Sequence, residues 1–335
     1  MNLVTGATGL LGSHIVEKLV DAGEPVRALV RPTSDTRLLE RLGVELSVGD
    51  VTEPASLPPA MQGVRTVYHA AAKVGDWGPW REFEAISIDG TRNMLSAAAN
   101  AGVDRFLHVS SISAYGHPDG EGLVLDETAP LGVNLHRWSY YSRAKVAAER
   151  LARAAHDRGD VPVTVVKPSW LYGERDRSSM PRLIRAVRKG KAKLIGGGDN
   201  RLNLTYAGNE AEGCILAATH PDAVGGSYNL SNDGVITQRE YFNKIAECLG
   251  AEPVTKTVPY KVAYKAAFLM ELFGHLFRKK SPPLVTRYSV WLMGRRCYFS
   301  CEKARKELRW QPTVGYDEGI ERTVRWCLDH GLGEP

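Results

Sequence analysis

TGATGLLG, residues 5–12, places glycines at positions 6, 9 and 12 between an apolar, strand-like run and a helix-like run. A chain that passes from strand to helix through such a loop can turn tightly at Gly6, bring its backbone close to a phosphate at Gly9, and pack its helix closely at Gly12. The start of the helix offers free N–H groups and a positive dipole end to the phosphates. We therefore predict a dinucleotide-binding loop. Its expected contacts are Gly6, Thr8, Gly9, Leu10, Leu11 and Gly12.

The residues that follow the loop alternate short apolar runs with helix-like runs, which predicts a parallel sheet covered by helices on both faces. We expect strands at 1–6, 25–31, 43–50, 65–72, 104–111, 161–168 and 202–208. We expect helices at 13–22, 81–101, 141–157, 179–189, 237–249 and 317–330. The fold class is therefore α/β, a Rossmann doubly wound parallel sheet with a smaller C-terminal α/β lobe. We assign residues 1–170, completed by about 203–232, to nucleotide binding, and 171–202 and 233–335 to a substrate-binding lobe.

The composition argues against several classes of function. The 335 residues carry 43 basic and 38 acidic side chains, a net charge of +5 without a dense basic block, so we expect no nucleic-acid partner. Five cysteines without a CxxC pair indicate reduced thiols, so we expect no metal site. The chain enters an apolar run at once, without a charged leader, and we therefore expect a cytoplasmic protein.

Residues 258–277, VPYKVAYKAAFLMELFGHLF, form the most apolar segment. A membrane-spanning helix needs about 20 predominantly apolar residues. Lys261, Lys265 and Glu271 interrupt this segment, so we expect no transmembrane helix. Its apolar residues recur at the spacing of an amphipathic helix. We favour packing of that face in the core; the alternative is a hydrophobic lid or a contact of residues 258–280 with a membrane surface.

The ends of the second and third predicted strands carry candidate contacts to the adenosine half of a dinucleotide. An acidic residue after the second strand would accept the 2′-hydroxyl of NAD, but this chain has Arg31. Because a guanidinium suits a 2′-phosphate, we expect NADP to be preferred over NAD; the alternative is that Arg31 only faces solvent. Asp50, in the motif GDV, is placed to meet the adenine edge, although Asp at a strand end is equally a turn former. We add Val51, its neighbour, to the expected contacts.

A second stretch, YYSRAK at 140–145, carries candidate proton-transfer residues. Tyr141 and Lys145 are four apart and lie on one face of the predicted helix. A phenol has a pKa near 10, and a neighbouring ammonium should lower that pKa enough for Tyr141 to act as a general acid or base. Ser110 or Ser111, at the end of the fifth predicted strand, would bind the oxygen of a substrate carbonyl.

Six motifs in this order, TGATGLLG, GDV, HAAA, VSSISAYG, YYSRAK and KPSWLYG, resemble those of the extended short-chain dehydrogenase/reductase family over almost the whole chain. The resemblance implies that Ser111, Tyr141 and Lys145 are the catalytic residues and that Lys145 also binds the nicotinamide ribose. It further implies that Ala70 and Ala71 line the cofactor and that Pro168 lies beside the nicotinamide. The family also implies a homodimer through the helices that flank Tyr141. Three positions depart from the pattern: Ser87 replaces a frequent asparagine, Lys167 a frequent arginine and Asn209 a frequent acid.

Within the family, residues 71–80 and the C-terminal segment most resemble the 3β-hydroxysteroid and sterol dehydrogenase branch, which includes bacterial reductases of long-chain β-keto acids. This resemblance implies an NAD(P)-dependent oxidoreductase acting on a small, hydrophobic alcohol or ketone. Tryptophans in the expected site loops also suggest an apolar pocket; they are Trp77, Trp80, Trp138 and Trp170. The alternatives are a nucleotide-sugar epimerase or dehydratase, which uses the same three residues, and a non-catalytic regulator that senses NAD(P).

Overall fold

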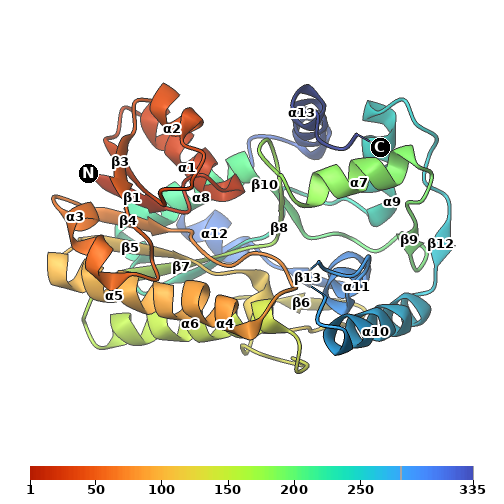
Figure 1. Ribbon diagram of the computed structural model, residues 1–335, viewed down its shortest axis with the longest axis horizontal. Coiled ribbons are helices and arrows are strands. Elements are labelled where there is room, and N and C mark those ends of the chain that lie inside the picture. Colours follow the sequence, from red (N-terminus) through yellow and green to blue (C-terminus); the bar gives the residue numbers. More distant parts are fainter. Residues whose placement is uncertain (280, 335) are drawn as a thin grey trace.

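The computed structural model describes residues 1–279 and 281–334, so Lys280, the last basic residue of 278–280, lies outside the described residues. Its centre is a seven-stranded sheet in which every neighbouring pair is parallel and the order is β11-β7-β5-β4-β1-β2-β3 (Figure 1). The strands are β1 (Asn2–Thr5), β2 (Val26–Val30), β3 (Glu45–Val48), β4 (Thr66–His69), β5 (Arg105–Val109), β7 (Val163–Pro168) and β11 (Ser227–Leu230). The predicted Rossmann sheet is confirmed, because each of the first six predicted strand segments contains a strand of this sheet.

Two hydrophobic clusters cover the two faces of the sheet. Consecutive strand residues belong to opposite clusters: Leu3 packs on one face and Val4 on the other, as the two-residue period of a strand requires. Both faces are buried, which explains why these strands read as continuous apolar runs.

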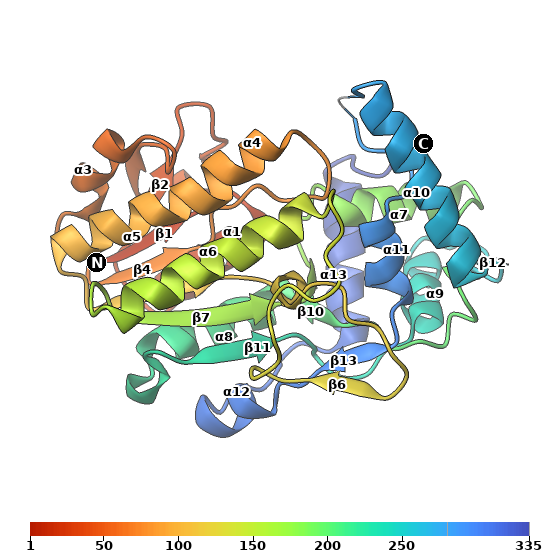
Figure 2. The ribbon, with the colours of Figure 1, turned by 90° about the horizontal axis from the view of Figure 1, so that it is seen from below.

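The helices of one face are α3 (Leu57–Met61), α5 (Gly90–Ala101) and α6 (Tyr140–Asp157), and Figure 2 shows α5 and α6 in front of the sheet. The other face is covered by α1 (Leu10–Asp21) and α8 (Ala207–Thr219), which pack against each other. Helix α1 begins at Leu10, three residues before the predicted start, because Gly9 already acts as its N-cap.

Helix α8 has no counterpart among the predicted helices, and the predicted strand at 202–208 ran into its first turn. Its sequence, AGNEAEGCILAAT, lacks a polar stripe because most of the helix is buried between the sheet and α1. A helix buried on most of its surface shows no strong apolar period, and this removes the signal on which sequence prediction depends.

The second lobe contains α7 (Ser179–Arg188), α9 (Gln238–Cys248) and α13 (Tyr316–Asp329) around a core that includes Tyr172, Ile184 and Tyr241. The capping box predicted at 237–240 is confirmed, since Thr237 and Glu240 each bond the backbone of the other. Three small parallel pairs join its segments: β8 (Trp170–Tyr172) with β10 (Leu204–Tyr206), β9 (Leu194–Ile195) with β12 (Thr257–Val258), and β6 (Leu123–Leu125) with β13 (Cys297–Phe299). The remaining helices are α2 (Arg37–Arg41), α4 (Trp80–Phe83), α10 (Tyr260–Leu276), α11 (Arg287–Gly294) and α12 (Glu302–Glu307).

The apolar helix α10 packs differently from our expectation. Only Ala267, Glu271 and Gly274 of this helix are buried, so the prediction that its apolar face lies in the core is wrong. Its large apolar residues are exposed instead, and they include Val262, Phe268, Leu269, Met270, Leu272, Phe273 and Leu276. Within the described part of the chain, no helix combines the length and apolar character needed to cross a membrane.

Candidate active site

The predicted site residues meet at one edge of the sheet. Strands β1, β4 and β5 are neighbours and run in parallel, so the segments that follow them emerge side by side. These segments are the glycine loop, the Ala70–Ala71 turn and the serines at 110 and 111. Pro168 ends β7, the next strand, and reaches the same edge.

The glycine loop is packed too tightly for side chains at two positions. A Cβ at Gly12 would lie 2.1 Å from the Gly6 carbonyl oxygen, and one at Gly6 would lie 2.9 Å from the Ala71 nitrogen. Gly6 also has a φ of +69°, which favours glycine. Thr8 and Gly9 are exposed at the start of α1, where the helix presents its first N–H groups. This cradle of backbone, free of side chains, fits the pyrophosphate of a dinucleotide.

A buried chain of hydrogen bonds holds the cradle against β4. Thr5 Oγ1 lies 2.9 Å from His69 Nδ1, and His69 Nε2 lies 3.0 Å from Thr91 Oγ1. Thr5 Oγ1 also accepts a hydrogen bond from the Ala71 amide at 3.2 Å. Burial lowers the pKa of His69 to about 3, so the ring is neutral and acts as a fixed hydrogen-bonding link.

The three residues expected near adenosine lie in different surroundings: one is exposed, one forms a turn and one is buried in the core. Arg31 follows β2 and is exposed, and its side chain makes no hydrogen bond or ion pair with any residue that the structure describes. Asp50 accepts hydrogen bonds from the amide and hydroxyl of Thr52, at 2.9 and 2.8 Å, as a turn former does. The Val51 side chain is buried in the core. Arg31 is therefore the group available to a ligand phosphate.

Tyr141 lies in the first turn of α6, half-buried and facing the end of β5. Burial raises the pKa of its phenol above the ordinary value, and the facing hydroxyls of Ser111 and Ser113 oppose that rise. Our expectation that a neighbouring ammonium lowers this pKa is wrong for the chain as it stands, because desolvation of the phenolate outweighs the other effects. The ring of Tyr288, from α11, meets the Tyr141 ring edge-on with centroids 6.0 Å apart.

Lys145 shares the Tyr141 face of α6 and is 5% exposed. Its ammonium donates a hydrogen bond to the Val109 carbonyl at the end of β5, at 2.8 Å. Burial lowers the pKa of Lys145 to about 8, and the charge of Glu149 opposes this shift. The lysine is thus held between α6 and β5, beside the segment that carries Ser111.

The structure separates the two serines that the sequence left as alternatives. Ser110 donates to a Glu149 carboxylate oxygen at 2.6 Å and so points away from Tyr141. The Glu149 carboxylate also forms ion pairs with the Arg153 guanidinium at 2.8 Å and with the Lys167 ammonium at 3.1 Å. Ser110 therefore belongs to a buried ionic network. Ser111 faces Tyr141, and the structure brings together Ser111, Tyr141 and Lys145.

A small cavity adjoins Tyr141. Its walls come from both lobes: Asp76, His136, Trp138, Ser139, Tyr140, Tyr141, Ser142, Glu271 and Tyr288. Helix α10 covers it, because Phe268 stacks on Trp138 and His275 packs on Trp77 at 4.5 Å between ring centroids. Sequence reasoning placed Trp138 correctly. Trp170 instead packs against Tyr241 in the core of the second lobe, so its expected place near the site is wrong.

Ser113 and Tyr288 escaped sequence reasoning altogether. No sequence pattern distinguishes Ser113 from Ser110 and Ser111. Ser113 faces the Tyr141 phenol because it lies in a 3₁₀ turn, Ile112–Tyr115. Tyr288 lies far along the chain on α11 and is brought to Tyr141 by the packing of the second lobe.

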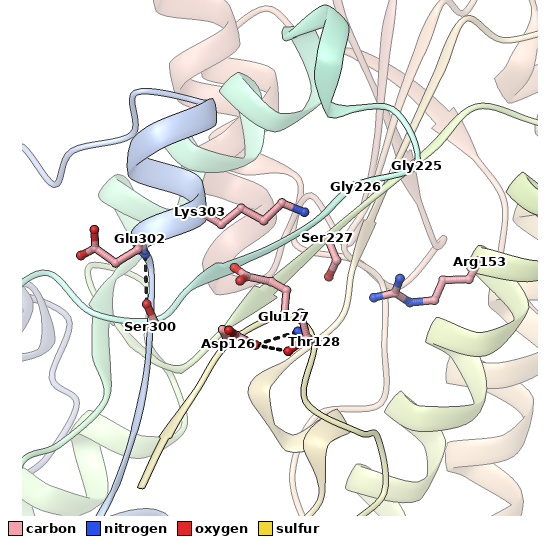
Figure 3. A pocket seen from close by; sticks show the side chains of 10 residues that line it. All are labelled: Asp126, Glu127, Thr128, Arg153, Gly225, Gly226, Ser227, Ser300, Glu302 and Lys303. Atoms are coloured by element: carbon pink, nitrogen blue, oxygen red, sulfur yellow. Dashed lines mark hydrogen bonds between the residues drawn. The ribbon is translucent and has the colours of Figure 1, made fainter. Parts of the chain in front are cut away.

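A larger cavity, of about 420 Å³, lies away from Tyr141 at the β11 edge of the sheet (Figure 3). Its lining mixes acidic and basic groups, with Arg153 and Lys303 pointing in alongside Glu127. Arg153 is already paired with Glu149, and Lys303 lies over the Tyr228 ring. None of the predicted site residues lines it. Across residues 1–279 and 281–334, no three His, Cys, Asp or Glu side chains converge to hold a metal ion.

Comparison with known proteins gives consistent matches. Residues 2–231 match the model of the NAD dependent epimerase/dehydratase family. The chain is 32% identical to the 2-alkyl-3-oxoalkanoate reductase of Stenotrophomonas maltophilia (strain K279a), covering 96% of this chain and 97% of the relative. It is 32% identical to the decarboxylating sterol-4-alpha-carboxylate 3-dehydrogenase of Mus musculus, covering 96% and 89%. The crystal structure of gox2253 is similar with a TM-score of 0.83 at 29% identity, covering 100% and 99%.

Proposed function

Because the chain belongs to the NAD dependent epimerase/dehydratase family, we propose that it is an NAD(P)-dependent oxidoreductase acting on a hydrophobic secondary alcohol or ketone. The observation that carries the proposal is the placing of Ser111 opposite Tyr141, beside a cavity with aromatic walls and next to the glycine cradle. The named relatives, a reductase and a dehydrogenase, support this reaction class.

Each residue then has a chemical part. Ser111 donates a hydrogen bond to the substrate oxygen and holds it near the Tyr141 hydroxyl. Tyr141 passes its proton to that oxygen during reduction and takes it back during oxidation. Lys145, cationic below its pKa of about 8, stabilises the phenolate that forms. When bound, the nicotinamide supplies or accepts the hydride.

The names of two relatives support a substrate class. One relative is named for an oxoalkanoate with its oxo group at carbon 3, and another for a sterol with a carboxylate at carbon 4 that is oxidised at carbon 3. In both compounds the carboxylate is attached to the carbon next to the reacting carbon. We propose a hydrophobic 3-oxo acid, or the corresponding 3-hydroxy acid, as the substrate of this chain.

A panel of substrates tests the reaction class. With NADPH or NADP, nicotinamide absorbance should change in proportion to product for long-chain 3-oxo or 3-hydroxy acids and for hydroxysteroids. A nucleotide-sugar epimerase would instead interconvert UDP-sugars without net change of absorbance, and a regulator would bind NADPH without turnover. Turnover of UDP-sugars alone, or of no compound in the panel, would sink the proposal.

We further propose a preference for NADP, because Arg31 stands exposed at the end of β2 with its guanidinium unengaged among the described residues. A charge-assisted, two-pronged contact suits a phosphate and has no counterpart for a ribose hydroxyl. Asp50 remains the proposed contact to adenine, and Ala70, Ala71 and Pro168 the proposed contacts nearer the nicotinamide.

Replacing Arg31 by alanine should lower kcat/KM with NADPH by roughly 10- to 100-fold, the worth of one or two charge-assisted hydrogen bonds. The value with NADH should change little. Initial rates with both cofactors measure this, and Arg37→Ala is the matched control, because Arg37 is also exposed nearby but is paired with Asp35. Equal losses with both cofactors would remove Arg31 from phosphate recognition.

We also propose a division of roles between the two lobes, a homodimer and a cellular location. Residues 1–170, completed by about 203–232, bind the dinucleotide, and 171–202 with 233–335 hold the substrate. The chain forms a homodimer through α5 and α6, which sedimentation would measure. We place the protein in the cytoplasm, consistent with five cysteines that are all free thiols.

We also propose that α10 rests on an anionic membrane surface. Its exposed apolar residues are flanked by the exposed cations Lys261, Lys265, Arg278 and Lys279. The one acidic residue of α10, Glu271, is buried and paired with Arg287. An apolar strip bordered by cations complements a bilayer with anionic headgroups. Since α10 also covers the cavity, this contact would bring the bilayer to the site of a hydrophobic substrate.

Vesicle binding tests this contact. The triple variant Leu269→Ser, Phe273→Ser, Leu276→Ser should bind phosphatidylglycerol vesicles at least about 100-fold more weakly, since each apolar side chain contributes about 1.5–3 kcal/mol when fully immersed. Val235→Ser, at a residue 59% exposed in the second lobe, is the control and should bind like the unmodified chain. Two results would contradict the proposal. One is that the unmodified chain, the triple variant and Val235→Ser sediment equally with phosphatidylglycerol vesicles; the other is that the unmodified chain binds phosphatidylcholine vesicles as tightly as phosphatidylglycerol vesicles.

A further inference from the structure

Arg295, the residue that follows α11, is buried without an ionic partner in the part of the chain that the structure describes. Its side chain is 1% exposed, and only Nη1 makes a hydrogen bond, to the Leu292 carbonyl at 3.1 Å. Nε and Nη2 are buried and have no partner among residues 1–279 and 281–334. Nε and Nη2 form the edge of a guanidinium that binds a carboxylate with two parallel hydrogen bonds.

Among the described residues, the surroundings of Arg295 provide no buried anion to balance its charge. The groups whose ionised forms would act on it most strongly are Cys297 and Tyr288, and burial raises the pKa of both, so both are neutral. Asp119 also acts on Arg295, but it is exposed and its carboxylate accepts the backbone amide of Arg296 at 2.8 Å. The guanidinium rests instead on aromatic rings, 4.4 Å from the Trp291 centroid. A buried cation left in this state is unfavourable unless a ligand supplies the missing charge.

Arg295 also lies beside the candidate site. Tyr288, Trp291 and Arg295 are spaced three and four apart and form one row along α11, which begins at the Tyr141 ring. The row is bordered by His117, whose ring lies 4.9 Å from Trp291 and 5.4 Å from His136 in the cavity wall. Both nitrogens of His136 are buried without a partner among the described residues. His136 and Ser139 in the cavity wall therefore carry buried polar atoms without a partner among the described residues, and each side chain can donate a hydrogen bond.

We infer that Arg295 binds the carboxylate of the substrate, with Nε and Nη2 as the two donors and His136 as a neighbouring donor. This inference rests on the proposed function and names the group that recognises the acidic end of a 3-oxo or 3-hydroxy acid. Tyr288 lines the cavity and Arg295 does not, so the inference requires the Tyr288 ring to turn aside when the acid enters. Arg287, at the other end of α11, is already engaged by Glu271 through its amide and Nε, both at 2.7 Å.

Kinetics with an acid and its ester test the inference. The substrates are a long-chain 2-alkyl-3-hydroxy acid and its methyl ester, which differ in charge at one group, and oxidation is followed by nicotinamide absorbance. Arg295→Gln should lower kcat/KM for the acid by about 100-fold, as expected for the loss of one partner of a buried charge pair. The value for the ester should change by less than about threefold. Arg296→Gln is the matched control, because that neighbour is exposed and pairs with Glu121, and both substrates should react as before.

Thermal unfolding supplies a second readout. The acid with NADP should raise the unfolding temperature of the unmodified chain, but not that of Arg295→Gln, whereas the unliganded variant should unfold no earlier. Parallel losses for acid and ester, together with a lower unfolding temperature of the free variant, would show that Arg295 only supports the fold and would overturn the inference. If the ester is oxidised and the acid has no advantage, this inference fails and the proposed function stands. If neither compound reacts, the proposed function fails, and the temperature shift with acid still decides the role of Arg295.

Discussion

Replacing Tyr141 by phenylalanine should lower kcat by about 1,000-fold while the affinity for NADPH stays unchanged. The substitution removes the hydroxyl that faces Ser111 and Ser113 and keeps the ring that packs against Tyr288. A positioned acid or base contributes roughly 100- to 10,000-fold to a rate, and no other phenol in the first turn of α6 can replace it. Single-turnover rates and fluorescence titration with NADPH measure the two quantities.

Tyr140→Phe is the matched control, since the adjacent ring packs on Trp80 and Phe83, at 5.7 and 6.0 Å between centroids. Its activity should remain within about threefold of the original value, because the change removes no group that faces the serines. A kcat for Tyr141→Phe close to that of Tyr140→Phe would exclude Tyr141 as the proton carrier. A joint loss of NADPH binding would instead indicate that the variant is misfolded.

Introducing one methyl group at Gly12 should abolish productive binding of the cofactor. The Cβ of Gly12→Ala would lie 2.1 Å from the Gly6 carbonyl oxygen and 2.6 Å from its carbon, so the loop or α1 must shift. A displacement of about 1 Å at a binding loop costs about 100-fold in rate, and overpacking lowers the free energy of unfolding by about 1–3 kcal/mol. NADPH titration and chemical denaturation report the two effects.

Gly120→Ala provides the comparison, because a Cβ there meets its nearest atom, Leu123 Cβ, at an ordinary 3.7 Å. That variant should bind NADPH and unfold like the unmodified chain. Unchanged binding of NADPH by Gly12→Ala would mean that the phosphates lie elsewhere than over this loop.

Sequence reasoning was most successful where one local pattern determines the structure. The glycine loop, the parallel strands and the α6 face that carries Tyr141 and Lys145 follow from short motifs and helical or strand periods. The choice between Ser110 and Ser111 did not, because it depends on Glu149, which draws Ser110 away from the site. Tyr288 reaches the cavity, and Arg295 is buried against Trp291, through the packing of α11, which no local period encodes.

The position of α10 shows a different limit. The apolar spacing of this segment correctly predicted a helix. The helix turns Glu271 and Gly274 inward, because Glu271 pairs with Arg287 and Gly274 packs directly against the Trp77 ring. Apolar spacing alone cannot distinguish a helix face that packs in the core from an apolar face that is exposed at the surface. The pKa of Tyr141 was missed for a related reason, since the extent of burial depends on α11 and the second lobe.

The sheet order has a consequence for synthesis on the ribosome. Lys167 of β7 and Ser227 of β11 are hydrogen-bonded partners 60 positions apart, and α8, which covers one face, lies between them in sequence. At about 5–20 residues per second, the nascent chain adds this stretch in roughly 3–12 s. Throughout that interval the part of the sheet face that α8 later covers and the open edge of β7 have no cover from their own chain. A chaperone that shields apolar strand edges should therefore engage the chain after β7 emerges and leave once β11 has paired.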